Sequence, residues 1–151
     1  MIYCVLREFT LPNDGIWPQY AIQTRSGQSI VFHGGIALHD PVRRVCMMSA
    51  EGRHIVHSHG GQRGSDTGRC NGPHRLAVDA YESVFVADRY NRRVTLLSPT
   101  LEYVRQVVSR DQLKGEPRSL YLDTRQRLLY VAGNELGKGE WRGGHVAVFS
   151  V

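Results

Sequence analysis

The chain of 151 residues is 41% hydrophobic and 22% charged, a composition typical of a globular protein and not of a disordered one. No apolar run approaches the roughly 18 residues that span a bilayer, and Arg7 and Glu8 interrupt the stretch in which a secretory signal needs an apolar core, so we expect a cytoplasmic protein without a membrane segment. The net charge of +5 comes from arginine, which provides 17 of the 19 basic residues; it fits an acidic protein partner, RNA, or a merely solvated surface.

Short segments rich in Val, Ile, Tyr and Phe recur about every 8 to 12 residues and are separated by Gly, Pro, Asn, Asp or Ser. No segment keeps a period of about 3.6 residues for long enough to form a helix. This pattern predicts an all-β fold. In chain order we expect strands at residues 2–9, then at 19–23, 28–33, 43–48 and 53–58, then at 75–79, 84–88, 92–97 and 102–108, and finally at 118–122, 127–132 and 145–150.

These strands fall into three groups that each begin just after a proline. Pro18, Pro73 and Pro117 are 55 residues apart (73 minus 18) and then 44 apart (117 minus 73). Repeats of roughly 40 to 50 residues with several short strands each are typical of β-propeller blades. We therefore expect a half or partial β-propeller of about three four-stranded antiparallel blades, at residues 16–61, 62–110 and 111–151, with the third blade lacking its outer strand and residues 1–15 supplying the fourth strand of a closing blade.

Three blades are too few to close a ring within one chain, because propellers typically have about 4 to 8 blades. Two arrangements remain open from the sequence. A homodimer could complete a ring of about six blades around a two-fold axis, with each amino-terminal strand completing the partner's third blade. Alternatively, the polypeptide is the carboxy-terminal half of a longer propeller, or it remains an open half-ring.

Aspartates end two of the expected strands in the central group, Asp79 the strand at 75–79 and Asp88 the strand at 84–88. An aspartate in this position can accept hydrogen bonds from the free N–H groups of its turn, and an arginine that begins the next strand, here Arg93, can pair with it. We expect structural roles for all three side chains.

The central group resembles an NHL repeat, a pattern of short apolar strands punctuated by Asp, Ala-Asp and Asn-x-Arg-Val. The matching residues are Pro73, Leu76, Ala77, Val78, Asp79, Val84, Phe85, Val86, Ala87, Asp88, Asn91, Arg93 and Val94. The resemblance implies an NHL-type propeller, similar to the carboxy-terminal region of tripartite-motif (TRIM) proteins, and it gives Asn91 a structural role as well. Such propellers present a broad loop face to protein partners and form the substrate-recognition end of ubiquitin ligases; some bind single-stranded RNA.

The two outer groups depart from this repeat at the turn positions. In the first group Gln23 stands where the first Asp is expected, and Phe32-His33 replaces Ala-Asp. In the third group Gly133 replaces the second Asp, and Gly144-His145 replaces the Arg. These changes put functions tied to the turn residues in doubt for the outer groups, while the strand pattern survives.

Catalytic and metal-binding motifs are missing from the sequence. It contains no nucleophile elbow, P-loop, HExxH or dinucleotide fingerprint, so we expect no catalytic residues, no cofactor and no enzymatic activity. Any ubiquitin ligase activity needs a RING domain that this chain does not contain. His57 and His59 could chelate zinc from one face of a strand, but on a predicted outermost strand they are better interpreted as solvated, and we expect no metal.

The expected binding residues are arginines near predicted loop ends and tryptophans in predicted loops, where they could stack on a base or hold a peptide. We expect a protein partner first, with single-stranded RNA on an arginine-rich face as the alternative, and no membrane. The candidates are Arg43, Arg44, Arg89, Arg92, Arg118, Arg142, Trp17 and Trp141.

Overall fold

The computed structural model describes residues 18–34, 42–136 and 141–151, which form three antiparallel sheets. Sheet I contains β1 (Pro18–Gln23), β2 (Ser29–Gly34), β3 (Val42–Met48) and β4 (Ile55–Gln62). Sheet II contains β5 (Pro73–Val78), β6 (Val84–Asp88), β7 (Arg93–Leu97) and β8 (Tyr103–Val108). Sheet III contains β9 (Glu116–Asp123), β10 (Leu128–Leu136) and β11 (Trp141–Ser150).

The expected all-β class is confirmed, as is the division into sheets of four, four and three strands. Within the described ranges the only helical element is one short 3-10 turn, Arg110–Gln112. No helix in this part of the chain has the length and apolar character needed to cross a membrane. The expected strand at 2–9, and with it the closing segment 1–15, lies outside the described residues.

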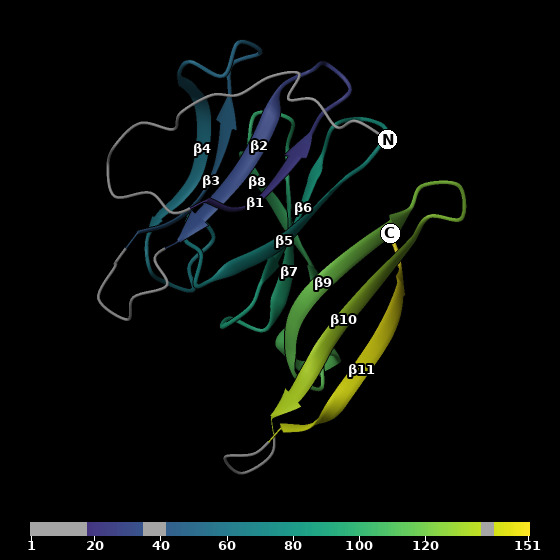
Figure 1. Ribbon diagram of the computed structural model, residues 1–151. Helices are drawn as coiled ribbons and strands as arrows, with labels where there is room; N and C mark the ends of the chain where they lie inside the picture. Colours follow the sequence, from purple (N-terminus) through teal and green to yellow (C-terminus); the bar gives the residue numbers. More distant parts are fainter. Residues whose placement is uncertain (1–17, 35–41, 137–140) are drawn as a thin grey trace, which may run out of the picture.

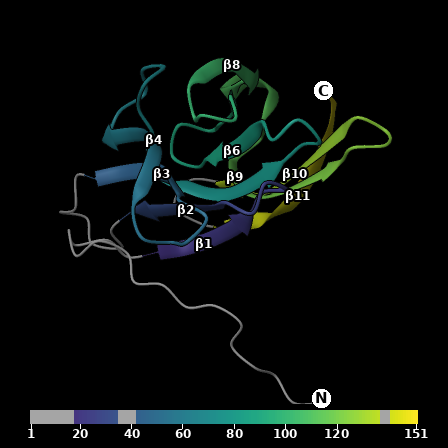
Figure 2. The same ribbon diagram turned by 90° about the horizontal axis from the view of Figure 1, so that it is seen from above.

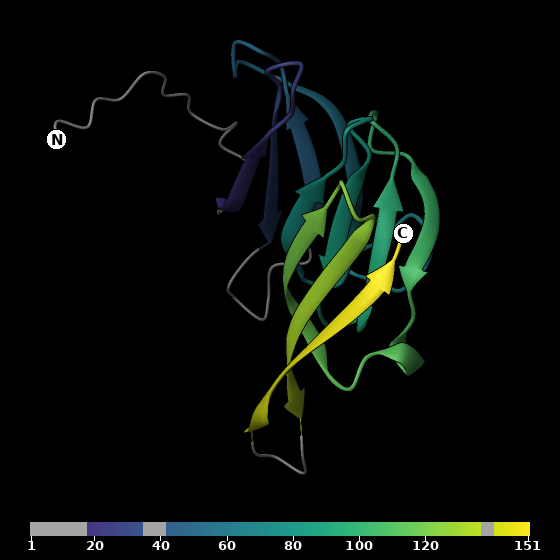
Figure 3. The ribbon, with the colours of Figure 1, turned by 90° about the vertical axis from the view of Figure 1, so that its right-hand side faces the viewer.

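Each sheet is a simple meander, since strands that follow one another in the sequence pair with one another. The sheets follow one another in chain order (Figure 1), and the first strands β1, β5 and β9 contact their neighbours in turn. Seen from above, β3 and β4 lie on one side, β6 and β8 in the middle, and β10 and β11 on the other side (Figure 2). Figure 3 shows sheet III crossing in front of sheet II. The described residues form an open stack, not a closed ring.

The three sheets share one irregularity, a bulge just after a proline that is the first or second residue of the first strand. Pro18 pairs with His33, Pro73 with Asp88 and Pro117 with Gly133, and in each case the following residue is skipped before the pairing resumes. Proline donates no hydrogen bond to a ladder and is therefore tolerated at the start of a strand or at a bulge. The shared bulge makes the three sheets comparable residue by residue: His33, Asp88 and Gly133 are equivalent, and so are their partners on the third strands, Arg44, Arg93 and His145.

Two apolar clusters hold the stack together, one on each face of sheet II. The cluster toward sheet I contains Ile30, Phe32, Val45, Met47, Leu76, Val84, Val86, Leu97 and Leu101. The cluster toward sheet III contains Ala77, Phe85, Val94, Val108, Leu113, Leu129 and Val131. Strand β6 contributes to both clusters, which explains why its sequence is apolar at every position up to Asp88 and does not alternate.

Turns at one end of the stack connect sheets I and II. Glu82, in the turn between β5 and β6, has a φ of 65°, in the left-handed region that favours glycine. The corresponding turn of sheet I, between β1 and β2, has Gly27 with a φ of 85°. The Glu82 carboxylate accepts hydrogen bonds from the Ser26 N–H at 2.6 Å and from the Ser26 hydroxyl at 3.0 Å. The Glu82 side chain therefore joins the two sheets despite its unfavourable backbone conformation, which a glycine at this position could not do.

The outer face of sheet III, formed by Tyr121, Tyr130, Val146 and Val148, points away from sheet II. Tyr130 pairs in register with Tyr121 on one side and Val148 on the other, while the alternating residues Leu129 and Val131 pack toward sheet II. Tyr121 and Val146 are each 65% exposed and Val148 is 50% exposed. This face is apolar and, within the described part of the chain, uncovered.

Candidate functional site

The carboxylate of Asp88 is the centre of a buried polar cluster that also contains Asn71, Asn91 and Arg93. Asp88 is fully buried, and its oxygens accept hydrogen bonds from the Asn71 backbone N–H at 2.7 Å, from Asn91 Nδ2 at 2.7 Å and from Arg93 Nε at 2.9 Å. Burial raises the pKa of Asp88, while the bonds from Asn71 and Asn91 and the charge of Arg93 act in the opposite direction. Because all three partners are donors, the geometry suits an ionised carboxylate.

Arg93 also organises the segment that leads from sheet I to sheet II. Its guanidinium donates to the backbone carbonyls of Ser65 at 2.6 Å, Asp66 at 3.2 Å and Arg69 at 2.8 Å. Asn91 donates to the carbonyl of Gly64 at 2.8 Å. Carbonyl oxygens of a loop need partners when they are buried, and the fork of an arginine supplies several donors at once. The cluster thus fixes the path of the connecting segment.

Asp79 occupies the preceding turn and has a more local role. Its Oδ1 accepts hydrogen bonds from the backbone N–H groups of Tyr81 and Ser83, both at 2.8 Å. Asp123 of sheet III accepts in the same way from Arg125 and Gln126. The carboxylate closes its own turn in both sheets.

His59 is buried in β4, so the interpretation of both His57 and His59 as solvated side chains is wrong for His59. It lies opposite Val45, which belongs to the core toward sheet II, and it is only 7% exposed, whereas His57 is exposed. Burial lowers the pKa of His59, and the charge of Arg93 lowers it further, while Asp88 and the Leu101 backbone oppose this. Across the described ranges no three His, Cys, Asp or Glu side chains come together as metal ligands.

Three of the candidate binding arginines donate hydrogen bonds within the chain, and a fourth, Arg118, lies in an ion pair. Arg89 Nε lies 2.6 Å from Glu116 Oε2, and Arg118 lies 3.7 Å from the same oxygen. Arg92 donates to the Leu113 carbonyl at 3.0 Å. Arg43 donates to the Val42 carbonyl at 3.0 Å and is 8% exposed. These four side chains therefore interact with neighbouring strands and connecting segments of the chain itself.

The remaining candidates are distributed as follows. Arg44 lies in β3 opposite His33, at the position that Arg93 has in sheet II. Trp141 and Arg142 belong to strand β11, so the expectation of a loop at Trp141 is wrong: the end of β10 is long enough for Leu136 to pair with Trp141. The structure does not describe their side chains, and Trp17 lies outside the described residues.

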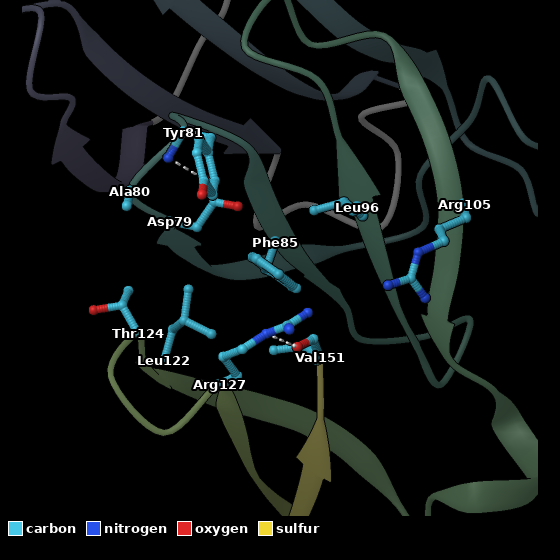
Figure 4. Close-up of a pocket in the computed structure, with 10 residues that line it drawn as sticks. All are labelled: Asp79, Ala80, Tyr81, Phe85, Leu96, Arg105, Leu122, Thr124, Arg127 and Val151. Carbon is cyan, nitrogen blue, oxygen red and sulfur yellow. Dashed lines mark hydrogen bonds between the residues drawn. The ribbon is translucent and has the colours of Figure 1, made fainter.

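An inter-sheet cleft opens between sheets II and III at the end of the stack opposite the Asp88 cluster. Its volume is about 490 Å³, and it is lined by Asp79, Ala80, Tyr81, Phe85, Leu96, Arg105, Leu122, Thr124, Arg127 and Val151. Figure 4 shows Phe85 and Leu96 on one side and Leu122 and Arg127 on the other, with the Arg105 guanidinium pointing into the space between them. Arg127 Nε donates to the Val151 carbonyl at 3.1 Å, and Tyr81 at the rim is 83% exposed.

The cleft residues were not among the binding residues expected from the sequence. Arg105 lies in the middle of an ordinary strand and Arg127 in a turn, and no motif connects them. A weak signal exists in β8, where Arg105 and Gln106 interrupt the apolar residues of the segment Tyr103–Val108. The surroundings of the Arg105 side chain depend on how the sheets stack, and the sequence of one strand does not predict this.

The comparisons with known proteins bear on the fold. No protein-family model matches the sequence, and no curated protein matches it. The structure is similar to that of a protein of unknown function from Bacteroides caccae, with a TM-score of 0.53 and 14% sequence identity. The match covers 91% of this chain and 48% of the other, so the chain spans about half the length of that structure. At this identity the likeness shows the fold alone.

Replacing Asp88 by asparagine keeps the side-chain shape but leaves the Arg93 guanidinium buried without its counter-charge. We expect the free energy of unfolding, measured by urea denaturation, to fall by about 3 kcal/mol or more. Asp79→Asn is the matched control, because it alters a carboxylate that serves only its own turn; a loss of about 1 kcal/mol is expected. Equal losses for the two variants would contradict the central role of Asp88.

The lowered pKa of His59 predicts a pH dependence of stability. The unfolded chain gains a proton on this side chain near the ordinary value of 6.5, whereas the folded chain resists protonation until a lower pH. The stability contributed by neutral His59 is therefore present above pH 6.5 and is lost as the pH falls below it. His59→Gln should flatten the melting temperature profile in this window, while His57→Gln should leave its slope unchanged. Parallel profiles for the parent and His59→Gln would refute the prediction.

Proposed function

We propose that the chain is a non-catalytic binding module that recognises a protein partner through the inter-sheet cleft. The main observation behind this proposal is that the cleft combines an apolar floor with two arginines from facing sheets. Phe85 is 4% exposed at the base, and Arg105 and Arg127 line the cleft from sheets II and III. A volume of about 490 Å³ is within the usual range for binding pockets.

The chemistry of the cleft favours a peptide segment in which an apolar residue stands beside Asp or Glu. The apolar floor accepts the hydrophobic side chain, and guanidinium groups are well suited to a neighbouring carboxylate. Tyr81 at the rim offers a large amphipathic surface, and tyrosine and arginine are common among the residues that carry binding energy at protein interfaces.

Single-stranded RNA is the weaker proposal. RNA binding would require an arginine-rich face. Several arginines of that face already contact carboxylates or carbonyls of the chain itself, namely Arg89, Arg92, Arg93 and Arg118. An arginine committed in this way contributes less to counterion release on phosphate binding. The protein-binding proposal does not use these side chains.

We propose further that the three sheets are part of an NHL-type propeller of the TRIM kind. The proposal is supported by the shared proline bulges and by the contacts among Asp88, Asn91 and Arg93. In such a protein the cleft selects the substrate of a ubiquitin ligase, and a RING domain carried elsewhere transfers ubiquitin.

The apolar outer face of sheet III suits another sheet stacked as sheets I to III are stacked, and we propose that a second copy of the chain supplies it. Light scattering should then give twice the 17.0 kDa mass of one chain at micromolar concentration. Val148→Asp places a charge on this face and should yield the single-chain mass, while Val104→Asp, at a similarly exposed valine of β8, should not. A single-chain mass for the parent protein would overturn this arrangement.

Panning a random peptide library against the chain tests the cleft directly. Enriched peptides should carry an apolar residue next to Asp or Glu, and fluorescence polarisation should show binding weakened about tenfold or more by Arg105→Ser. Arg110→Ser, another exposed arginine placed away from the cleft, is the matched control and should bind as the parent does. Binding to a single-stranded RNA oligonucleotide that Arg105→Ser leaves intact, without selection of any peptide, would overturn the proposal.

A further inference from the structure

The inter-sheet cleft has opposite charges at its two ends. Figure 4 shows Asp79 at one end of the cleft and Arg105 at the other, with Phe85 between them. Within the described part of the chain these two charged side chains form no ion pair, either with each other or with another residue. Arg105 is exposed and Asp79 is partly exposed, and both line the cleft. The cleft therefore offers a carboxylate in addition to its arginines.

Only one oxygen of the Asp79 carboxylate takes part in closing the turn. Oδ1 accepts both hydrogen bonds, from the N–H groups of Tyr81 and Ser83. Oδ2 accepts no hydrogen bond from the described residues. An ionised carboxylate has about four acceptor positions on its two oxygens. Asp79 therefore closes its turn and still has an oxygen that can accept from a donor entering the cleft.

The side chains that line the cleft near Asp79 suit a cation. Tyr81, at the rim, has a largely exposed aromatic ring, and the face of such a ring attracts an ammonium or guanidinium group. Thr124 contributes a hydroxyl from the facing sheet III. Lysine and arginine side chains have several donors and no acceptor, so this end of the cleft offers them suitable partners.

The turn that contains Asp79 and Tyr81 is also held from the side of sheet I. The Glu82 carboxylate accepts hydrogen bonds from the N–H and the hydroxyl of Ser26, at 2.6 Å and 3.0 Å. The turn is therefore fixed both by its own hydrogen bonds and by a contact with the neighbouring sheet. A binding group that is fixed in advance loses less conformational entropy when the ligand binds.

We propose that the partner segment contains a basic residue that binds at Asp79, in addition to the acidic residue that binds at Arg105, with the apolar residue between the two. This inference rests on the proposed function, because it assigns a third position of the same partner segment. The two ends of the cleft then determine the direction in which the segment binds. A segment entering in the reverse direction brings like charges together, which is unfavourable.

The test uses fluorescence polarisation with four short labelled peptides. Two of them contain glutamate, leucine and lysine, in this order and in the reverse order. In the other two, norleucine replaces lysine, which keeps an aliphatic side chain but removes the charge. In one of the two orders lysine should bind about fivefold more tightly than norleucine, the upper range for a partly exposed ion pair, and in the other order the two should bind alike.

Two variants of the chain test whether Asp79 provides this preference for lysine. Asp79→Asn keeps an oxygen that can close the turn but removes the charge, so the preference should disappear. Asp123→Asn is the matched control. Asp123 closes the corresponding turn of sheet III, with hydrogen bonds from Arg125 and Gln126 at 2.9 Å and 3.0 Å, and it does not line the cleft. The preference for lysine should persist in this variant.

The outcomes separate this inference from the proposed function. Peptides that bind, are weakened by Arg105→Ser and show no preference for lysine in either order overturn the inference and leave the proposed function intact. An equal loss of the preference in Asp79→Asn and Asp123→Asn also overturns it, because the effect would then follow net charge or turn closure in general. Absence of binding by all four peptides overturns both proposals. The comparison of lysine with norleucine uses the parent protein, so it does not depend on the folding of a variant.

Discussion

The burial of the Asp88 carboxylate is the constraint that fixes the chain segment between sheets I and II. Its three donors come from the segment before sheet II, from the turn after β6 and from the start of β7, so one charge ties together parts that are distant in the sequence. Arg93 then extends the network to three carbonyls of the connecting segment. Buried ion pairs contribute little net stability compared with apolar residues of the same size, but breaking one is costly. The cluster therefore selects one path for the chain, while the apolar faces of sheet II provide most of the favourable free energy.

The strand pattern could be predicted from sequence because each signal is local. Val84–Asp88 is predicted by its apolar run between turn residues, and the structure places β6 over the same five residues. Pro18, Pro73 and Pro117 mark the first strands because proline has no N–H for the ladder, and all three are found at the same bulge. The largest deviations are in β4, which ends at Gln62 and not at the expected residue 58, and in sheet III, where β10 and β11 extend well beyond the expected 127–132 and 145–150. Glycine and polar residues end a strand in most contexts, yet long hairpin arms can continue through them.

The site residues were harder to predict, since their roles depend on how the sheets face one another. Arginines at strand ends suggest a binding surface in the sequence, but Arg89 and Arg118 converge on Glu116, and Arg92 caps a carbonyl of the next segment. Arg105 and Arg127 are unremarkable in sequence, and only the packing of sheet II against sheet III brings them to one cleft. His59 illustrates the same limit. The alternation of side chains along β4 predicts which face of the strand carries His59, but its side chain is buried because another sheet packs on that face.

The meander topology has an evolutionary corollary. Every sheet is built from one uninterrupted stretch of chain, and each of the described sheets packs only on its sequence neighbour. Duplication or deletion of a single unit can therefore lengthen or shorten the stack without rethreading any strand. Individual copies are also free to diverge, as the change from an aspartate–arginine pair to glycine and histidine shows, because a neighbouring copy still enforces the common geometry.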